Sequence, residues 1–377
     1  MAFVLSEEQQ MLRDSALSFA SEKLPVSQLR ALRAAGQGYD KGAWGEMAEL
    51  GFAGVVIPEE FGGSGFGYVG LGQVLEAQGR TIAASPLLST ALMGASALIV
   101  NGSQAQKEAY LPKIASGELL VALAVDESAH HDPAHIKLSA KKSGSGYALS
   151  GEKRYVVDGA DADLLIVAAR TSGDAGDATG ITLFLVAGDA KGVSRNALKT
   201  LDAHAAANIA FAGVEVGADA VLGAVDAGYP ALEAILDRAR IGLAAEMLGA
   251  SDAAFEMTAE YLKVRKQFGQ LIGSFQSLQH RAAIMFTELE LTRSCVAAAL
   301  DALDRNANNV AELASLAKAR AAETLHLVSN ETVQMHGGIG MTDVHDSGLY
   351  MKRARVLEAL YGGESFHRDR YARIGGY

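Results

Sequence analysis

The sequence predicts a multi-domain α+β protein. A helical N-terminal domain, a small central β-domain and a C-terminal four-helix bundle are expected in that order. The 377 residues exceed what one hydrophobic core usually serves. Hydrophobic residues make up 49% and charged residues 20%, which is typical of a globular chain and excludes disorder as the main state. Helix-type, strand-type and again helix-type patterns follow one another along the chain.

The first domain, residues 1–119, is predicted to be helical. Ser6 followed by acidic residues is a helix-start signal, and Pro25 interrupts the helical pattern. Further helical stretches are expected around Trp44–Leu50, Gly72–Gly79, Leu87–Val100 and Gln104–Ile114.

The second domain, residues 120–223, is predicted to be a small barrel or sandwich. Short β-rich runs are separated by turn residues, a spacing that does not favour βαβ units. Gly144-Ser145-Gly146 is a plausible hairpin turn, and Ser172–Gly180 is a longer polar loop. The runs expected as strands are Leu119–Val125, Tyr147–Leu149, Leu164–Ala168, Ile181–Val186 and Asn208–Phe211.

The third domain, residues 224–377, is predicted to be a helical bundle with a short tail helix. The chain has 41 Gly but only 6 Pro, and Ala is abundant, a balance that favours closely packed helices. The expected helical segments are about 231–263, 275–304, 309–336 and 347–360.

The charge and cysteine content narrow the class of protein. The formal net charge of −11 provides no basic face for nucleic acid and disfavours an anionic membrane surface. The single Cys295 excludes an intramolecular disulfide framework and fits a reducing compartment. Residues 1–20 do not read as a signal peptide, and no apolar run is long enough to span a bilayer, so we expect a cytoplasmic protein.

Three local patterns are interpreted as structural. The stretch Gly62–Gly67 lacks the strand–helix context and the Lys of a phosphate-binding loop, so a flexible turn is favoured. His130, His131 and His135 have no second cluster that would complete a metal site, so a solvated loop is favoured and no metal is expected. No Gly-x-Ser-x-Gly motif occurs, so hydrolase chemistry has no nucleophile signal.

Two segments of the C-terminal half are suited to binding a nucleotide cofactor. In residues 261–269, YLKVRKQFG, an Arg, a Gln and an aromatic residue gather at a helix end, and an Arg fork with planar amides suits a pyrophosphate and an adenine edge. In residues 334–340, QMHGGIG, a long helix stops at paired glycines, which let backbone amides approach a phosphate. Each segment alone is equally well explained by a helix cap or an Arg–carboxylate pair.

Together the two segments resemble the acyl-CoA dehydrogenase family, in which a Tyr-x3-Arg-x-Gln-Phe-Gly…Phe-Gln segment and a Gln-x2-Gly-Gly-x-Gly segment both bind FAD. Trp44–Gly63 resembles the family's N-terminal signature. Gly151–Gly159, followed by Ala162-Asp163-Leu164, resembles its central β-domain signature. The resemblance covers nearly the whole chain and implies FAD as cofactor and an acyl-CoA as substrate.

The resemblance also implies a cofactor site shared between subunits. The Arg265 segment of one subunit would meet the pyrophosphate and adenosine of an FAD held mainly by a neighbour, and the paired glycines would complete that site. A homo- or heterotetramer, α2β2 included, is therefore expected. The implied cofactor-binding residues are Arg265, Gln267, Phe268, Gln276, Gln334, Gly337, Gly338, Val125, Tyr155 and Val157.

The flavin-facing stretches depart from the family pattern. The family's Thr-Glu-Pro-x2-Gly-Ser-Asp reads VDESAHHD in residues 125–132, so Val125 replaces a hydroxyl. The family's Trp-Ile-Thr reads Tyr155-Val156-Val157, which loses a second hydroxyl. Backbone N–H groups there could still contact the flavin, and Tyr155 can pack as an aromatic ring. FAD binding is therefore expected, while the affinity and redox tuning are left open.

Both customary positions of the catalytic base carry other residues. Dehydrogenation needs a carboxylate that removes the α-proton while hydride leaves the β-carbon. The family's Glu in Tyr-Glu-Gly-Thr corresponds to Tyr361, or to Gly362 with a shift of one residue. The alternative Glu before a helix Arg corresponds to Ala239, which precedes Arg240, a residue expected on the substrate side.

One carboxylate is a candidate for the missing base. Helical periodicity places Glu246 on an otherwise apolar or small stripe, about two turns or ~10 Å beyond Ala239. A buried carboxylate must be paired or protonated, so a catalytic role and a structural ion pair are both open. Glu364 and Asp237 are weaker alternatives.

Three functions remain as hypotheses. The leading one is FAD-dependent α,β-dehydrogenation of an acyl-CoA thioester, with electrons passed to an electron-transferring flavoprotein. The second is a base-less partner subunit of a heteromeric acyl-CoA dehydrogenase. In its extreme form, the chain is a scaffold that only contributes Arg265 and Gln334 to the FAD site of another subunit. The third is a flavin monooxygenase on the same fold. Residues 341–353, MTDVHDSGLYMKR, resemble bacterial members that act on steroid side chains, dicarboxylates or aromatic acids, several of which pair a base-bearing with a base-less chain.

Overall fold

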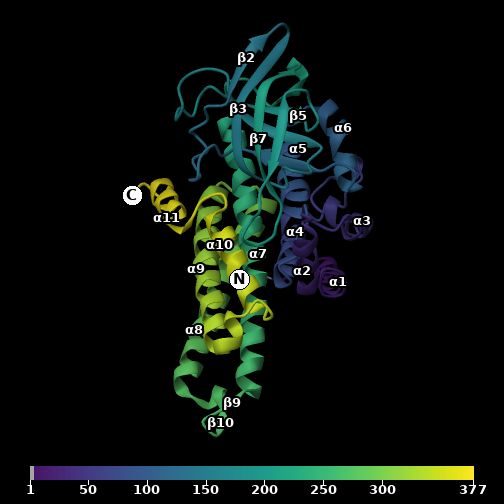
Figure 1. Cartoon of the computed structure of the whole chain (residues 1–377). Helices are drawn as coiled ribbons and strands as arrows, with labels where there is room; N and C mark the ends of the chain where they lie inside the picture. Colours follow the sequence, from purple (N-terminus) through teal and green to yellow (C-terminus); the bar gives the residue numbers. More distant parts are fainter. Residues whose placement is uncertain (1–3) are drawn as a thin grey trace. The chain divides into compact units, whose positions relative to one another are not determined.

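The first part of the chain is helical, as predicted (Figure 1). The computed structural model describes residues 4–377. Ser6 and Gln9 form a reciprocal capping box that starts the first helix, and the chain breaks at Pro25 before the second. The helices are α1 (Glu7–Lys23), α2 (Val26–Ala35), α3 (Lys41–Glu49), α4 (Gly67–Arg80), the π-helical η3 (Leu87–Gly94), α5 (Ala95–Asn101) and α6 (Gln104–Ala115).

The central part of the chain forms one eight-stranded sheet. The strands are β1 (Val121–Ala124), β2 (Ser139–Ser143), β3 (Gly146–Val157), β4 (Leu164–Arg170), β5 (Ile181–Ala187), β6 (Val193–Ala197), β7 (Ala206–Val216) and β8 (Val221–Leu222). Their order is β6-β7-β3-β2-β4-β5-β8, and β1 lies parallel to β4. Each predicted β-rich run overlaps one of these strands, with Leu119–Val125 extending beyond both ends of β1, and the predicted turn at Gly144-Ser145-Gly146 joins β2 to β3.

The sheet curls around its own core, as expected of a small barrel. Tyr147 of β3 and Phe184 of β5 are three strand spacings apart in the sheet order, which a flat sheet would separate by about 14 Å. Their ring centroids are 5.1 Å apart. The core that the sheet encloses includes Leu149, Leu165, Val167, Ile209 and Phe211.

The last part of the chain is a set of long helices that begin and end within about two residues of the predicted bounds. They are α7 (Tyr229–Val264), α8 (Gln276–Asp304), α9 (Val310–His336), α10 (Ser347–Ala359) and the tail helix α11 (Glu364–Ile374). A short hairpin of β9 (Lys266–Gln267) and β10 (Gln270–Leu271) joins α7 to α8. The order of helical, β and helical segments confirms the predicted α+β class.

Close packing groups the chain into two compact units. One consists of the residues up to Ala31, Tyr68–Ala83 and Arg240–Tyr377, and the other of Leu32–Gly67 and Ala84–Ala239. We call them the helical unit and the β unit, and each is described by itself. The three domains 1–119, 120–223 and 224–377 remain a prediction.

Within the helical unit, two glycines let α4 and α7 approach backbone to backbone. A Cβ on Gly79 would lie 2.0 Å from the carbonyl oxygen of Glu246, and a Cβ on Gly249 would lie 1.9 Å from that of Glu76. No real side chain tolerates either distance. The glycine content of these helices therefore has the packing role that the composition suggested.

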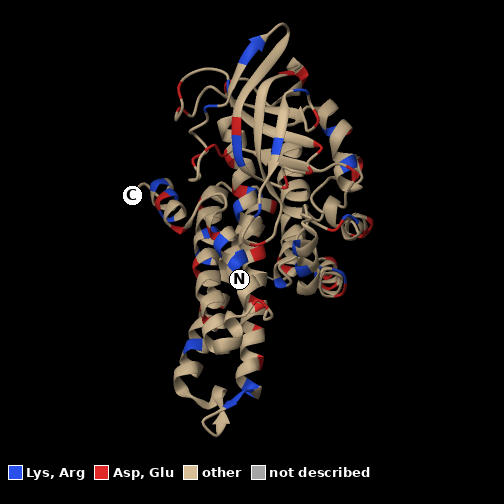
Figure 2. Ribbon diagram, in the orientation of Figure 1, with Lys and Arg blue, Asp and Glu red and all other residues tan. Residues whose placement is uncertain are grey.

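Charged residues of both signs are interspersed along the helices and strands (Figure 2). Among residues 4–377, no helix is long and apolar enough to cross a membrane. Within the same residues, no group of three His, Cys, Asp or Glu side chains could hold a metal ion. His131 instead pairs with Asp126 at 2.9 Å.

Candidate cofactor and substrate site

The Arg265 segment forms an exposed hairpin at the end of α7. Phe268 and Gly269 occupy the turn with φ of 54° and 81°, both left-handed, as a two-residue type I′ turn requires. Phe268 is 92% exposed, and its ring meets Phe275 edge-on at a centroid distance of 6.2 Å. The hairpin therefore presents an aromatic residue to solvent instead of burying it.

The polar members of the same segment are also exposed. Arg265 and Gln267 lie on the surface, and Gln276, the first residue of α8, is exposed beside them in sequence. Within residues 4–377, Arg265 makes no ion pair, so its guanidinium is available to an external anion.

The paired glycines end α9 with an open backbone. Gly337 has φ 64° and ψ −138°, a conformation that favours glycine, and it opens the 3-10 turn η6 (Gly337–Met341). At both Gly337 and Gly338 a Cβ would meet nothing within 4 Å. Gln334, one turn earlier, is exposed. The turn thus offers a bare backbone surface next to a side-chain amide.

In the β unit, the stretch after β1 is held by a buried lysine. Lys153 is fully buried, and its Nζ donates to the Val125 carbonyl at 2.8 Å and to Glu127 Oε1 at 2.7 Å. Glu127 also accepts from the backbone N–H groups of Lys137 and Leu138. Burial lowers the pKa of Lys153 to about 8, against the opposing effect of Glu127. Sequence reasoning did not select Lys153, although the GEKRYVV signature contains it.

Tyr155 lies at an irregularity of β3. The pairing of β3 with β7 shifts between Lys153 and Val156, and Tyr155 there has a φ of 49°. Its N–H donates to Asn208 Oδ1 at 3.1 Å. The chain itself thus uses the Tyr155 N–H, and the contact of this residue with the flavin remains a prediction. Val157 is half-buried, and its backbone pairs with Ala206.

Tyr361, which the sequence predicts at the position of the family's base, lies at the corner between α10 and α11. Tyr361 there is 4% exposed, with φ 54°. Its carbonyl oxygen accepts from Arg240 Nε at 3.3 Å and lies 3.2 Å from His367 Nε2. Arg240 is fully buried, and its guanidinium lies 5.5 Å from the Phe366 ring centroid. Within the helical unit Arg240 thus holds this corner, and its predicted place on the substrate side remains a prediction.

A second buried cation, Lys318 of α9, holds the same corner. Its Nζ donates to the carbonyl oxygens of Leu357, Glu358 and Gly362 at 3.0, 3.3 and 3.0 Å. Burial, and after it the Arg240 charge, lowers the pKa of Lys318 to about 7. Sequence reasoning missed Lys318. A lysine on an alanine-rich helical stripe is the sequence pattern that could have indicated its burial.

Glu246 is buried, as its stripe predicted, with 1% exposure. Its Oε1 accepts from Arg353 Nε at 2.9 Å and Nη2 at 2.6 Å. Its Oε2 is buried and has no hydrogen-bond partner in the described chain. This is the ion pair of the structural alternative, and the catalytic role of Glu246 remains untested.

The weaker base candidates differ in burial. Glu364 begins α11 on the surface, where its carboxylate pairs with Arg368 at 2.9 Å, so it is an exposed helix-end residue. Asp237 is 5% exposed within the β unit. Ala239 is fully buried and carries no titratable group.

Comparisons with known proteins assign the chain to a family. Three models match consecutive segments: acyl-CoA dehydrogenase N-terminal domain over residues 6–118, middle domain over 123–214 and C-terminal domain over 226–375. The mitochondrial isovaleryl-CoA dehydrogenase of Pongo abelii is 34% identical over 373 residues, which cover 97% of this chain and 88% of that protein.

Two further relatives are similar over nearly their whole length. Subunit CarC of the caffeyl-CoA reductase-Etf complex of Acetobacterium woodii is 30% identical and covers 96% of each chain. The solved ChsE4-ChsE5 complex from Mycobacterium tuberculosis contains a chain with a TM-score of 0.90 and 27% identity, covering 100% of this chain and 99% of that one. The chain belongs to the acyl-CoA dehydrogenase family. This family consists of FAD-dependent oxidoreductases that act on a CH–CH bond.

The residues present fit FAD at one end of the site. A pyrophosphate needs cationic and backbone N–H donors that the chain does not already use. The exposed guanidinium of Arg265 supplies such a group within the helical unit. The Gly337 N–H already donates to the Gln334 carbonyl, so at the open turn the fit depends on Gly338. In the β unit the two family hydroxyls are absent, and one backbone donor is used internally. The fit therefore rests on the phosphate-binding segments.

Proposed function

We propose that this chain is a subunit of a heteromeric, FAD-dependent acyl-CoA dehydrogenase, in which a second chain supplies the carboxylate that removes the substrate's α-proton. The observation that carries the proposal is the side chain at the corner between α10 and α11. Tyr361 stands where the family carries its Glu, and Ala239 stands at the alternative position. A phenol is mostly protonated at neutral pH, and a methyl group has no proton to exchange.

The chain keeps the groups expected to hold the cofactor. Arg265 and the Gly338 amide would bind the pyrophosphate of FAD, while Gln267 and Phe268 would contact its adenosine. Bound FAD would supply the hydride acceptor. A tetramer follows from this arrangement, because these exposed groups would serve an FAD held mainly by a neighbouring subunit.

The corner that carries Tyr361 is rigidly built. Arg240 and Lys318 bind four of its carbonyl oxygens, and both cations are fully buried. Such a corner would hold a side chain at position 361 in one place, which is what a base requires. The corner is firmly held, yet the side chain at position 361 is a poor proton acceptor. This combination favours a chain that lacks the base but retains the surrounding site.

The relatives support the partners of the proposal. CarC is by name a subunit of a complex with an electron-transferring flavoprotein, and ChsE4-ChsE5 is by name a complex of two chains. We infer that an electron-transferring flavoprotein removes the electrons here and that the base-bearing partner is a second member of the same family.

A homomeric dehydrogenase with Glu246 as base is the second candidate. The buried Oε2 of Glu246, which lacks a hydrogen-bond partner, is the observation in its favour. Against it stands the ion pair with Arg353, because both donors converge on Oε1 and stabilise the carboxylate in a structural role.

The two candidates are separated by anaerobic titration of the purified, FAD-loaded chain with a panel of acyl-CoA thioesters. We expect the wild-type chain alone to leave the flavin absorbance unchanged, because no base is in place. Tyr361→Glu should allow bleaching by at least one thioester, because it returns a carboxylate to the supported corner. The matched variant Tyr361→Gln, of equal size but without a titratable group, should not.

Bleaching of the wild-type chain alone, abolished by Glu246→Gln, would refute the proposal and establish the second candidate. The heteromer is tested by coexpression with a base-bearing family member from the same genome and native mass spectrometry. A wild-type homotetramer that is fully active without any partner would also refute it.

A further inference from the structure

An aromatic stack lies under the glycine turn that ends α9. His336, the last residue of α9, is 4% exposed, and its ring lies between those of Tyr261 and His345. The centroid distance is 4.4 Å on both sides, with an interplanar angle of 29° to Tyr261 and 47° to His345. Three rings from α7, α9 and the segment before α10 thus form one continuous column.

Hydrogen bonds set the orientation of the two imidazoles. His336 Nδ1 lies 2.7 Å from the Thr332 carbonyl oxygen, which can only accept, so Nδ1 carries the proton. His345 Nδ1 lies 2.9 Å from Ser347 Oγ and 3.2 Å from the Ser347 backbone nitrogen, so Ser347 fixes the orientation of this ring. Burial lowers the pKa of His336, which favours the neutral form of this ring.

The column touches both segments that carry the cofactor-binding motifs. At one end, the Tyr261 carbonyl accepts from the Arg265 N–H at 2.9 Å, and the Arg265 carbonyl accepts from the Ile272 N–H at 2.9 Å, which closes the base of the hairpin. At the other end, Ser347 Oγ donates to the Gly340 carbonyl at 3.1 Å, which anchors the far side of η6.

The turn itself rests on the middle of the column. At Gly340 a Cβ would lie 2.6 Å from the Val333 carbonyl and 3.1 Å from the His336 Cβ, so η6 folds back tightly onto the end of α9. Gly337 and Gly338, by contrast, have no neighbour above them. The turn is therefore packed against His336 on one side, while the Gly337 and Gly338 positions are open.

We propose that the Tyr261–His336–His345 column is a positioning element that holds the Gly337–Gly338 turn and the Arg265 guanidinium in one arrangement for a diphosphate. Arg265 and Gly337 are separated by the whole of α8 and α9 in sequence. The column joins the two segments through side chains of the helical unit, beside the hydrogen bond of Thr258 to Thr332 that also links α7 to the end of α9. The inference rests on the proposed role of these segments in cofactor binding, and it does not depend on the missing base.

The test compares His336→Ala, which removes the middle ring, with His336→Phe, which keeps a stacking ring but loses the Nδ1–H donor. FAD affinity is measured on the purified oligomer by fluorescence after removal and re-addition of the cofactor. Aromatic contacts of this kind are lost on both sides in the Ala variant, so we expect its Kd to rise about tenfold or more. The Phe variant should stay within about threefold of wild type, because stacking is retained.

A second readout follows the apoprotein by hydrogen exchange. His336→Ala should speed exchange in η6 and also in the β9–β10 hairpin, although the hairpin is not adjacent to residue 336 in sequence. Leu303→Ala, at the other end of α8, is the control for general loss of stability, because Leu303 is also buried but contacts neither segment. It should lower the melting temperature without raising the Kd for FAD.

Tyr261→Ala serves if His336→Ala fails to fold, because Tyr261 is only half-buried, and the same tenfold weakening is expected. The inference is overturned if the His336 or Tyr261 variant binds FAD as tightly as wild type, or if Leu303→Ala weakens binding equally. If the wild-type oligomer and the variants all bind FAD normally, only this inference fails and the proposed function stands. A wild-type oligomer that binds no FAD overturns both.

Discussion

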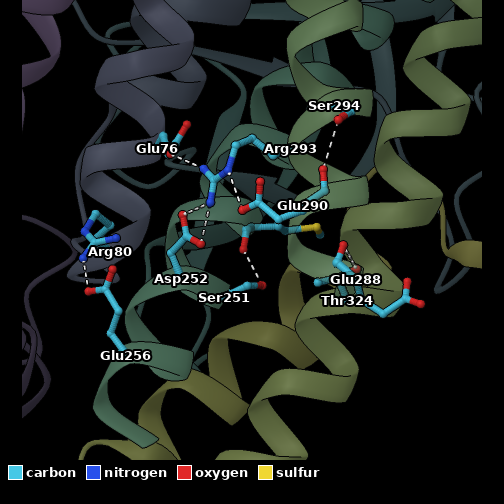
Figure 3. Close-up of polar contacts among 11 residues, drawn as sticks. Glu76, Arg80, Ser251, Asp252, Glu256, Glu288, Glu290, Arg293, Ser294 and Thr324 are labelled. Carbon is cyan, nitrogen blue, oxygen red and sulfur yellow. Dashed lines mark hydrogen bonds and ion pairs between the residues drawn. The ribbon is translucent and has the colours of Figure 1, made fainter. Parts of the chain in front are cut away.

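Glu76 is the carboxylate whose titration should most affect the stability of the helical unit. Arg293 of α8 faces three carboxylates from three helices (Figure 3). Its guanidinium lies 3.4 Å from Glu76 of α4, 2.8 Å from Asp252 of α7 and 3.2 Å from Glu290 of α8. One cation cannot neutralise all three. Of the three carboxylates, Glu76 lies farthest from the guanidinium. Replacing Glu76 by Gln removes one negative charge and keeps the shape of the side chain.

The sign and size of the effect follow from the pKa of Glu76. Burial raises that pKa from 4.5 to about 7; the Arg293 charge lowers it and the Asp252 charge raises it. Below about pH 4.5 the group is protonated in both folded and unfolded chains, so it costs nothing. As the pH rises from about 4.5 to about 7, only the unfolded chain releases the proton, and stability falls by at most about 3 kcal/mol. Because the side chain is 23% exposed, we expect about 1–2 kcal/mol.

The assay is thermal unfolding followed by the helical circular dichroism signal, for wild type and Glu76→Gln, between about pH 5 and about pH 8. The variant should be close to wild type at the lower pH and more stable at the higher pH, with a Tm difference that grows by about 2–4 °C. Glu260→Gln on α7, where the carboxylate is 71% exposed beside Lys263, is the control and should show no such trend. A Tm difference that is independent of pH, or a variant less stable at the higher pH, would show that the reasoning is wrong.

Two further predictions test the packing of the helical unit, each with a comparison variant. Gly79→Ala should lower the free energy of unfolding by about 3 kcal/mol, because its Cβ would lie 2.0 Å from a carbonyl oxygen of α7. Gly45→Ala on α3, with open space around it, should raise the free energy of unfolding by about 0.5–1 kcal/mol. Equal melting temperatures of the two variants would contradict the close approach of α4 and α7. Arg353→Met should lower the free energy of unfolding, measured in urea, by about 3–5 kcal/mol, because Glu246 is left as an uncompensated buried charge. Adding Glu246→Leu should restore most of this stability. A double variant as unstable as the single one would mean that Arg353 does not act through the ion pair.

The arrangement of helices and strands was largely predictable because its signals are local. The Ser6 capping box, the break at Pro25 and the Gly144–Ser145 turn each involve residues within a few positions of one another. Strands β2 and β6 were missed because their sequences, SAKKS and VSRNA, are polar and mostly exposed. Such strands form because neighbouring strands offer hydrogen bonds to their backbone, and a sequence pattern does not record that.

In the candidate site, too, the features with local signals were predictable from the sequence, and the others were not. The sequence by itself indicated the family, and it predicts the two phosphate-binding segments and Tyr361 in place of the base, since each depends on residue identities at short spacings. Only the tertiary structure decided that Glu246 pairs with Arg353, 107 residues away, and that Lys318 is buried against the corner of Tyr361. The physical reason is that burial and charge pairing depend on distances in space between elements that are far apart in sequence.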